Sequence, residues 1–478
     1  MSVSLTTRRD VTLDAYRLVA RDGHGVVLAP EALAVMDSCA ASFAALVRER
    51  VAADPGALIY GVTTAPGDGA AEALDAERQA RRPTRLWTAV SYGDPLPDRV
   101  VRGILLARLA NLLEGHAGAR AKVALAVAAM LDEGPLPVVP AQGNGGAGEI
   151  LALGSLFVDL SAQLELTPKE RMALINGSPC AAALVADVAL AGRERIALAE
   201  RVFALASDAI GAPEDAYCAD LETLWGDEHE TAALRALRAL LAGSPGTRQR
   251  HQAPVSFRIL PRVLGSARRA LAAAERAASI SLQSVTDNPV YIPPDAERPL
   301  GTVFSTGGYH DARAPAAMDS VAAACADLCQ LAERHTDQLF QHPVTAPLLS
   351  ADEWSVKSLH HAQNWWAEEA RSLAQPTLLS LAGFGQNDVP ALSFLAWRKA
   401  TAIGRCLDGA LAALAVLASQ ALHVAGRGAG PQLDAFLAEL RAQFPPVSPQ
   451  SGPLGRDCQA LMDCFTRRAL GDATAPAR

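Results

Sequence analysis

The chain has 478 residues, of which 50% are hydrophobic and only 5% aromatic, and its formal net charge is −8. This length can bury a large core in two or three domains, and the frequent alanines favour closely packed helices. The acidic balance, without a basic stripe, argues against a nucleic-acid partner.

Eight scattered cysteines in so long a chain do not form a disulfide framework, so we expect buried thiols. The first ten residues contain no apolar signal-peptide core. No apolar run without charges reaches the length of a membrane span, and no metal-ligand motif stands out. The expectation is a reduced, cytoplasmic protein with no membrane partner and no metal.

The N-terminal third is predicted to be largely helical. Residues 11–20 and 30–53 are expected to form helices, the second with a proline in its first turn. A short apolar segment then breaks into a loop after Tyr60, which by itself would be interpreted as a packing residue. Residues 98–113 have the spacing of an amphipathic helix.

A glycine-rich loop occupies the centre of this region, with four glycines between positions 143 and 148. Glycine permits backbone conformations that other residues avoid, and an apolar helical run starts at Ile150. We expect Glu149 in the first turn of that helix, where the helix dipole favours an anion. The loop could hold a phosphate, but it lacks the Lys-Ser/Thr of a P-loop, so composition alone favours a connector.

The second half is predicted as long helices with few breaks over residues 316–382, and residues after Gly471 are expected to be disordered. The Asn-Gly pair at 176–177 suits a helix end. His310 beside Asp311 could form a new acid–base pair, because histidine titrates near neutrality. The same two residues could be a simple turn, and the turn is slightly favoured.

The segments around these features resemble, in the same order, the motifs of the histidine and phenylalanine ammonia-lyase family. The approach Pro-Val-Val-Pro-Ala-Gln-Gly at 137–143 is similar to that family's prosthetic-group loop, where an Ala-Ser-Gly triad cyclises to an electrophilic methylidene-imidazolone. This chain has no serine there, so no side-chain oxygen can be eliminated and no cofactor is expected. The altered loop consists of Asn144, Gly145, Gly146, Ala147 and Gly148.

The resemblance also assigns roles residue by residue. Tyr60, in Tyr-Gly-Val-Thr-Thr, takes the place of the family's catalytic base, and Asn176, in Leu-Ile-Asn-Gly-Ser, that of the asparagine that binds the amino-acid part of the substrate. Arg258 stands at the carboxylate clamp, for which a planar guanidinium is suited. The other substrate-binding candidates are Gln252, Tyr92, Gln386 and Asn387, with Tyr92 standing for a substrate-contacting histidine.

The fold implied by the resemblance is mainly α and ammonia-lyase-like. An N-terminal helical and loop domain would span residues 1–205, and a bundle of long helices with a C-terminal tail would span residues 206–478. The resemblance further implies a small-molecule substrate and a homotetramer in which each active site draws on three subunits.

Three functions stay open on the sequence. The first is an enzyme that abstracts a proton from an amino-acid-like, carboxylate-bearing molecule, by elimination, isomerisation or cyclisation, without a methylidene-imidazolone. The second is a catalytically inactive protein that binds such a ligand or a partner, and the third is an ordinary aromatic amino acid ammonia-lyase.

Tyrosine has a pKa of about 10, so Tyr60 needs an electropositive environment to act as a base. Asn144-Gly145 could also cyclise to a succinimide, which would be a different electrophile.

Overall fold

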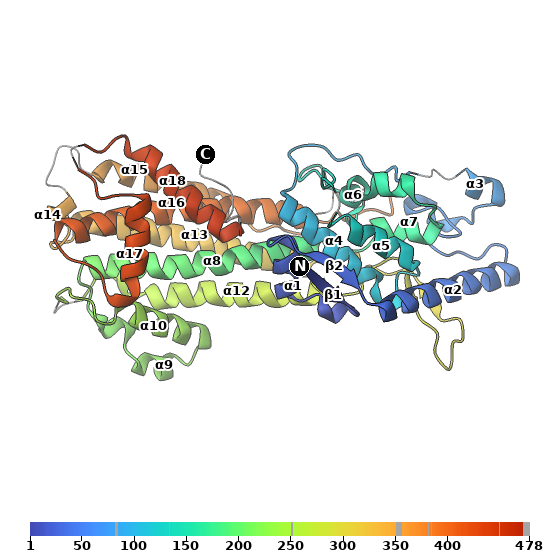
Figure 1. Cartoon of the computed structure of the whole chain (residues 1–478), viewed down its shortest axis with the longest axis horizontal. Helices are drawn as coiled ribbons and strands as arrows, with labels where there is room; N and C mark the ends of the chain where they lie inside the picture. Colours follow the sequence, from blue (N-terminus) through green and yellow to red (C-terminus); the bar gives the residue numbers. More distant parts are fainter. Residues whose placement is uncertain are drawn as a thin grey trace. The chain divides into compact units, whose positions relative to one another are not determined.

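The computed structural model describes residues 1–81, 85–132, 134–249, 252–349, 356–380, 382–383, 385–448 and 450–471, and the predicted disordered tail lies outside them. The described chain is mostly helical, which confirms the predicted fold class (Figure 1). It divides into two compact units. The first comprises Met1–Asp187, Glu275–Ala317 and Thr377–Arg398, and the second Val188–Ala274, Met318–Pro376 and Lys399–Arg478. The predicted two-domain division at residue 205 falls within helix α8 and stays a prediction.

The first unit holds two small sheets and most of the short helices. Its strands are β1 (Ser2–Leu5), β2 (Gly25–Leu28), β3 (Val290–Ile292) and β4 (Thr302–Phe304). Its helices are α1 (Leu13–Ala20), α2 (Pro30–Ala53), α3 (Ala76–Ala80), α4 (Asp98–Leu112), α5 (Ala121–Ala129), α6 (Ile150–Gln163) and α7 (Pro168–Ile175). β1 pairs in parallel with β2, and β3 pairs with β4 in an antiparallel hairpin. The helices predicted over 11–20 and 30–53 are confirmed.

Helix α4 differs from its prediction, because it is buried nearly all round and not only on one face. Thirteen of its fifteen residues are buried, and it packs against α1 and α5. Arg99, on this helix, hydrogen-bonds with Nε to the buried Asp187 at 2.9 Å. Burial alone would raise the pKa of Asp187, but Arg99 and Arg21 outweigh it and hold the pKa below its usual value. The charged Arg99 can thus be buried between helices because the carboxylate of Asp187, from another helix, neutralises it.

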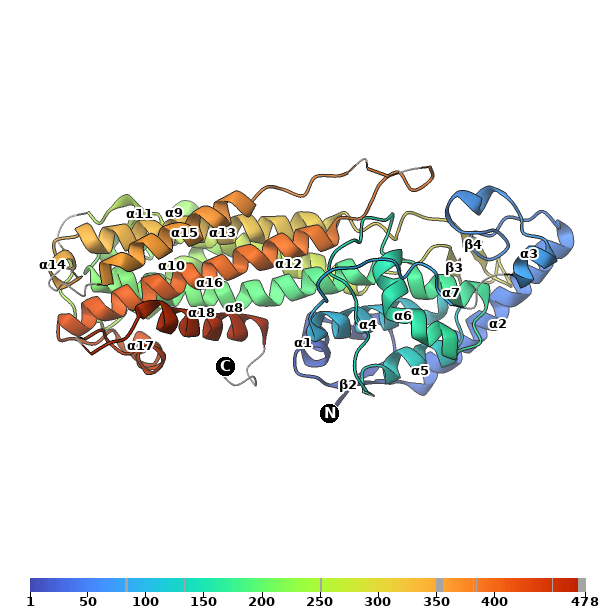
Figure 2. The same ribbon diagram turned by 90° about the horizontal axis from the view of Figure 1, so that it is seen from above.

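The second unit is a bundle of long helices. It contains most of α8 (Pro179–Ala209), α12 (Leu260–Leu282), α13 (Arg313–Gln341) and α16 (Ser393–Val424), which run side by side in this unit in both Figure 1 and Figure 2. Its other helices are α9 (Asp220–Trp225), α10 (Glu228–Leu241), α11 (Val255–Arg258), α14 (Ala346–Leu349), α15 (Leu359–Leu373), α17 (Pro431–Gln443) and α18 (Leu454–Leu470). The prediction of nearly continuous helix to residue 382 is wrong beyond Leu373, because the described residues between Ala374 and Leu392 form no helix.

A buried charge pair ties three helices of this bundle together. Arg195 on α8 donates two hydrogen bonds to Asp408 on α16, at 2.9 and 2.8 Å. Thr466 on α18 donates to the same carboxylate at 2.9 Å. The bidentate geometry satisfies both carboxylate oxygens, which is what makes burial of the pair tolerable.

Among the described residues, three stretches are long and apolar enough to cross a membrane by length and composition, contrary to the sequence prediction. They are Pro30–Ala53, Pro168–Ala209 and Ser393–Val424, with 28%, 100% and 83% of their most apolar windows buried in the protein. Burial inside the fold accounts for the apolar character of the last two.

Candidate active site

A small cavity in the first unit brings together several residues predicted from the sequence. It has a volume of about 100 Å³ and is lined by residues from seven separate parts of the chain. Four predicted site residues lie in its wall: Tyr60, Ala147, Asn176 and Asn387. The other lining residues are Pro66, Gly67, Trp87, Thr88, Ile150, Met172, Ile175, Asn288 and Tyr309.

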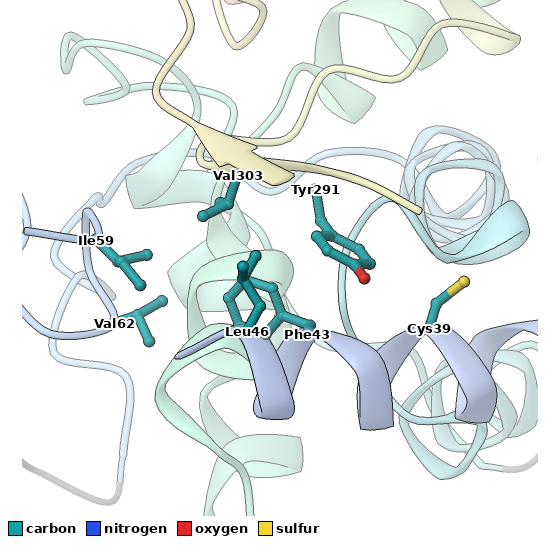
Figure 3. Packing of buried hydrophobic residues seen from close by; sticks show 7 residues of the cluster. All are labelled: Cys39, Phe43, Leu46, Ile59, Val62, Tyr291 and Val303. Carbon is teal, nitrogen blue, oxygen red and sulfur yellow. The ribbon is translucent and has the colours of Figure 1, made fainter. Parts of the chain in front are cut away.

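Tyr60 is positioned by buried neighbours on both sides. Ile59 and Val62 belong to a hydrophobic cluster whose other members come from α2 and from the β3–β4 hairpin, as Figure 3 shows. Within that cluster the rings of Phe43 and Tyr291 meet edge to face, with centroids 5.3 Å apart. A chain held at positions 59 and 62 leaves residue 60 little freedom, so the cluster fixes the base candidate at the cavity.

Glycine is favoured next to Tyr60. Gly61 has φ +65°, a left-handed backbone that other residues rarely adopt. A Cβ at this position would lie 2.7 Å from the flexible side chain of Met172, which lines the cavity and would have to shift. The turn is closed by Thr63, whose hydroxyl accepts a hydrogen bond from the backbone N–H of Ile59 at 2.7 Å.

The hydroxyl of Tyr60 accepts a hydrogen bond from the backbone N–H of Gly67 at 3.0 Å. Burial raises the pKa of Tyr60 above its usual 10.0; the Gly67 hydrogen bond opposes this rise, and Tyr309 adds to it. No lysine, arginine or histidine lines this cavity among the described residues. The chain by itself therefore keeps Tyr60 protonated at neutral pH.

The glycine loop reaches the cavity through Ala147. Gly148 has φ +69°, and a Cβ there would lie 3.1 Å from Cδ2 of Tyr309, so the loop can approach that ring only because residue 148 is glycine. The carbonyl of Gly146 accepts a hydrogen bond from the N–H of Ala391 at 3.0 Å. Asn144 donates through Nδ2 to the carbonyl of Pro140 at 2.8 Å. These contacts fix the loop backbone at both of its ends.

Glu149 is placed differently from its prediction. It is the N-cap residue of α6 and not part of the first turn, and its side chain makes no capping hydrogen bond there. Instead its buried carboxyl group accepts from the N–H groups of Cys180 and Ala181, at 2.5 and 2.6 Å, in the first turn of α8. Burial raises the pKa of Glu149 to about 8, although these N–H groups and Arg108 favour the charged form. The residue therefore links the glycine loop to a second helix start.

A buried polar network supports the two asparagines on the far wall. Asn176 ends α7, and its carbonyl accepts a hydrogen bond from the fully buried Arg108, which also donates to Ala173 O at 2.6 Å. Oδ1 of Asn288 accepts from the N–H of Thr306 at 2.9 Å. No described residue hydrogen-bonds to the amide nitrogen of Asn288, and this residue lines the cavity. Asn176 is held through its backbone carbonyl and Asn288 through its side-chain oxygen, so the amide of Asn176 and the amide nitrogen of Asn288 can face a ligand.

Residues 385–387 close the cavity from another segment. The N–H of Gln386 donates to Oδ1 of Asp68 at 3.0 Å, which joins this segment to the loop after Tyr60. Asn387 then lies in the cavity wall, whereas Gln386 does not. Of the two predicted neighbours, Asn387 is thus the better candidate for ligand contact.

Three further predicted contacts are not brought to this cavity. Tyr92 is 83% exposed and outside the lining, whereas Trp87 and Thr88, five and four residues earlier in the same segment, line the wall. Gln252 and Arg258 are exposed residues of the second unit, where Arg258 Nε donates to Ala253 O at 3.0 Å. Their predicted contact with substrate stays a prediction.

The acid–base pair suggested for His310 and Asp311 stays a prediction, and the alternative of a turn fits the contacts of Asp311. Asp311 accepts hydrogen bonds from the N–H groups of Arg313 and Ala314, at 3.0 and 3.3 Å, and from the hydroxyl of Ser281 at 2.5 Å. It therefore caps the start of α13. Neither residue of the pair lines the cavity, and Nε2 of His310 has no hydrogen-bond partner among the described residues.

Sequence reasoning missed Trp87, Thr88 and Met172 as wall residues. In the structure Trp87 is 66% exposed and Thr88 is 2% exposed, but burial is not visible in the sequence, so no signal there could have identified them. Among the described residues there is no group of three or more side chains able to hold a metal ion.

The chain is similar to known proteins over nearly its whole length. The family model for aromatic amino acid lyases matches residues 11–163 and 159–442. The histidine ammonia-lyase of Symbiobacterium thermophilum is 30% identical over 494 residues, covering 95% of this chain and 94% of that protein. That of Deinococcus radiodurans is 31% identical over 363 residues, with coverages of 69% and 67%.

Solved structures give the same fold. The tyrosine aminomutase of Streptomyces globisporus superposes with a TM-score of 0.86 at 24% identity, covering 100% of both chains. The ergothionase of Treponema denticola superposes with the same TM-score at 18% identity, covering 98% of this chain and 99% of that one. At these identities the structural likeness establishes the fold.

Proposed function

Because this chain belongs to the aromatic amino acid lyase family, we propose that it is a lyase-like enzyme working without a methylidene-imidazolone group. Its substrate is an amino-acid-like, carboxylate-bearing small molecule, and the reaction is a proton abstraction followed by elimination, isomerisation or cyclisation. The observation that carries the proposal is the absence of any serine, threonine or cysteine from Val138 to Glu149. The residues present do not fit the family's prosthetic group, because Ala147 offers no oxygen to eliminate.

Tyr60 is the base in this proposal. Its hydroxyl oxygen accepts a hydrogen bond from Gly67, which would stabilise the phenolate once it forms. The raised pKa of Tyr60 means that a cation must come close before it can take a proton. The ammonium group of the substrate, or Arg258 from a neighbouring chain in a homotetramer, would supply that charge.

The amide side chains of Asn176, Asn288 and Asn387 would orient the amino-acid part of the substrate. All three lie in the wall of the same small cavity. Amides offer both donors and acceptors, so they can hold an ammonium and a carboxylate without adding charge. Without the electrophile an ammonium is a poor leaving group, and we propose a substrate with a better leaving group or a more acidic C–H.

Intact mass spectrometry with near-ultraviolet absorbance tests the absence of the prosthetic group. The proposal expects the mass calculated from the sequence and no near-ultraviolet absorbance beyond that of the aromatic side chains. A deficit of two water molecules located in a peptide containing residues 143–149 would overturn it and restore the ordinary lyase. Turnover is then sought with a panel of amino acids that carry activated leaving groups.

The raised pKa of Tyr60 favours a second candidate, a ligand-binding protein without turnover. Ligand-dependent stabilisation across the panel with no product from any member supports this candidate against the enzyme. We further propose that the protein is a cytoplasmic homotetramer, which light scattering on the purified protein and fractionation of the source cells would test.

A further inference from the structure

A second, larger cavity in the first unit adjoins the Tyr60 cavity. It has a volume of about 400 Å³, compared with about 100 Å³ for the cavity at Tyr60. The two share five wall residues, which are Pro66, Trp87, Thr88, Met172 and Ile175. A ligand whose amino-acid end fills the smaller cavity would therefore have its other end in the larger one.

Among the described residues, the wall of this larger space, named the arginine cavity, contains four arginines and no carboxylate: Arg78, Arg81, Arg85 and Arg171. Guanidinium groups stay charged at all physiological pH values. The remainder of the wall is mostly apolar, with Leu74 and Leu86 added to the shared tryptophan, methionine and isoleucine. The composition is that of a site for an apolar body with an acidic end.

Neighbouring carboxylates offset only part of this positive charge. Glu77 lies 2.5 Å from Arg81, and Glu72 lies 3.6 Å from Arg78, but all four side chains are more than half exposed. Exposed pairs of this kind are weak and exchange readily for another anion. Arg85 makes no hydrogen bond or ion pair with any other residue that the structure describes. The guanidinium groups thus give the arginine cavity a positive character that an anionic ligand can match.

We propose that the arginine cavity binds an anionic group at the far end of the substrate, a carboxylate, sulfonate or phosphate. This inference rests on the proposed function in one respect, which is that the ligand of the arginine cavity is the substrate of the enzyme. The planar guanidinium fork pairs bidentately with each of these groups, and partial enclosure strengthens such charge-assisted hydrogen bonds. The substrate class is an amino acid whose side chain has an apolar spacer and a terminal acid.

The test compares two ligands that differ only at that end. Binding of O-phospho-L-tyrosine and of L-tyrosine to the full-length protein is measured by calorimetry. The phosphorylated ligand is expected to bind at least about tenfold more tightly, and Arg85→Gln is expected to remove most of this preference. Arg48→Gln is the matched control, because Arg48 is an exposed arginine of the same unit outside the cavity wall.

Equal binding of the two ligands, or no measurable binding of the phosphorylated one, would overturn the inference, as would a preference unchanged in Arg85→Gln. If that variant does not fold, Arg78→Gln replaces it, and inorganic phosphate must compete with O-phospho-L-tyrosine in the native protein. Tyr60→Phe separates the two proposals, because it should keep the preference for the anion. A preference without turnover of any acidic amino acid refutes the proposed function and leaves this inference standing.

Discussion

Glu149→Gln is expected to remove the pH dependence of stability that the buried carboxyl group of Glu149 creates. The pKa of this group is 4.5 in its usual setting and about 8 in the fold. Between these values the folded chain keeps a proton that the unfolded chain has released, so stability is fully present below pH 4.5 and falls as the pH rises through 8. At about 1.4 kcal/mol per pKa unit, the loss amounts to about 5 kcal/mol.

The glutamine variant lacks this titration but also lacks one acceptor. Glu149 uses one oxygen for the N–H of Cys180 and the other for that of Ala181, and an amide can accept only one of the two. The variant should therefore be less stable than the native protein by about 1–3 kcal/mol at pH 5. The difference should vanish and then reverse toward pH 9, where the native protein must bury a charge.

The assay is urea unfolding followed by tryptophan fluorescence, at fixed protein concentration, from pH 5 to 9. Glu170→Gln is the control, because the pKa of Glu170 is shifted in the opposite direction to that of Glu149. Burial alone would raise the pKa of Glu170, but the hydrogen bonds from Arg120 and Thr167 and the charge of Arg120 together outweigh it, so the pKa is lowered. Its stabilisation is present above pH 4.5 and is lost only as the pH falls through the lowered value, so its difference curve should be flat here. A flat difference curve for Glu149→Gln as well would refute the reasoning.

Four further predictions address the site and the fold. Tyr60→Phe should lower turnover by about 10²–10⁴-fold while the unfolding midpoint is kept, and unchanged kinetics would exclude Tyr60 as the base. Gly148→Ala should cost about 1–2 kcal/mol in denaturant unfolding and weaken ligand binding, because φ is +69° and the new Cβ would meet Tyr309 at 3.1 Å. Asp311→Ala should cost about 1 kcal/mol by loss of the α13 cap and leave the pH–rate profile unchanged, whereas a shifted profile would restore an acid–base role. Burial lowers the pKa of His335 from 6.5 to about 4, so stability should fall by about 3 kcal/mol as the pH drops from 6.5 to 4, a loss that unfolding curves of His335→Gln should not show.

Much of the site could be predicted from motif order. Tyr60, Ala147, Asn176 and Asn387 are spread over more than three hundred positions, yet they line one cavity. Local spacing could not have joined them, because periodicity describes only the face of each element. The resemblance of successive motifs to one family joined them, since it carries the tertiary arrangement with it.

Two acidic residues show what the sequence does not reveal. Glu149 was assigned to the nearest helix start, but its carboxyl group reaches the start of a helix thirty residues later. Asp311, for which a turn was slightly favoured over an acid–base pair, accepts hydrogen bonds from N–H groups at the start of the next helix. In both cases an acidic side chain satisfies unpaired N–H groups at a helix N-terminus. Sequence shows that a carboxylate is available and does not show which of several helix starts it will reach.

The cavity itself gives an argument about function. Its wall carries three asparagine amides and two tyrosine rings, together with Ala147 of the glycine loop. Polar groups in a confined space must be matched by hydrogen bonds, so this wall favours a polar ligand over an apolar one.

Both the proposed enzyme and the alternative binding protein need such a ligand, and the difference between them is the charge next to Tyr60. An ammonium or guanidinium brought to that hydroxyl would lower its pKa and make it a base, whereas a ligand without one would leave it a hydrogen-bond donor. The pH dependence of ligand binding, compared between native protein and Tyr60→Phe, therefore decides between catalysis and binding even before a product is identified.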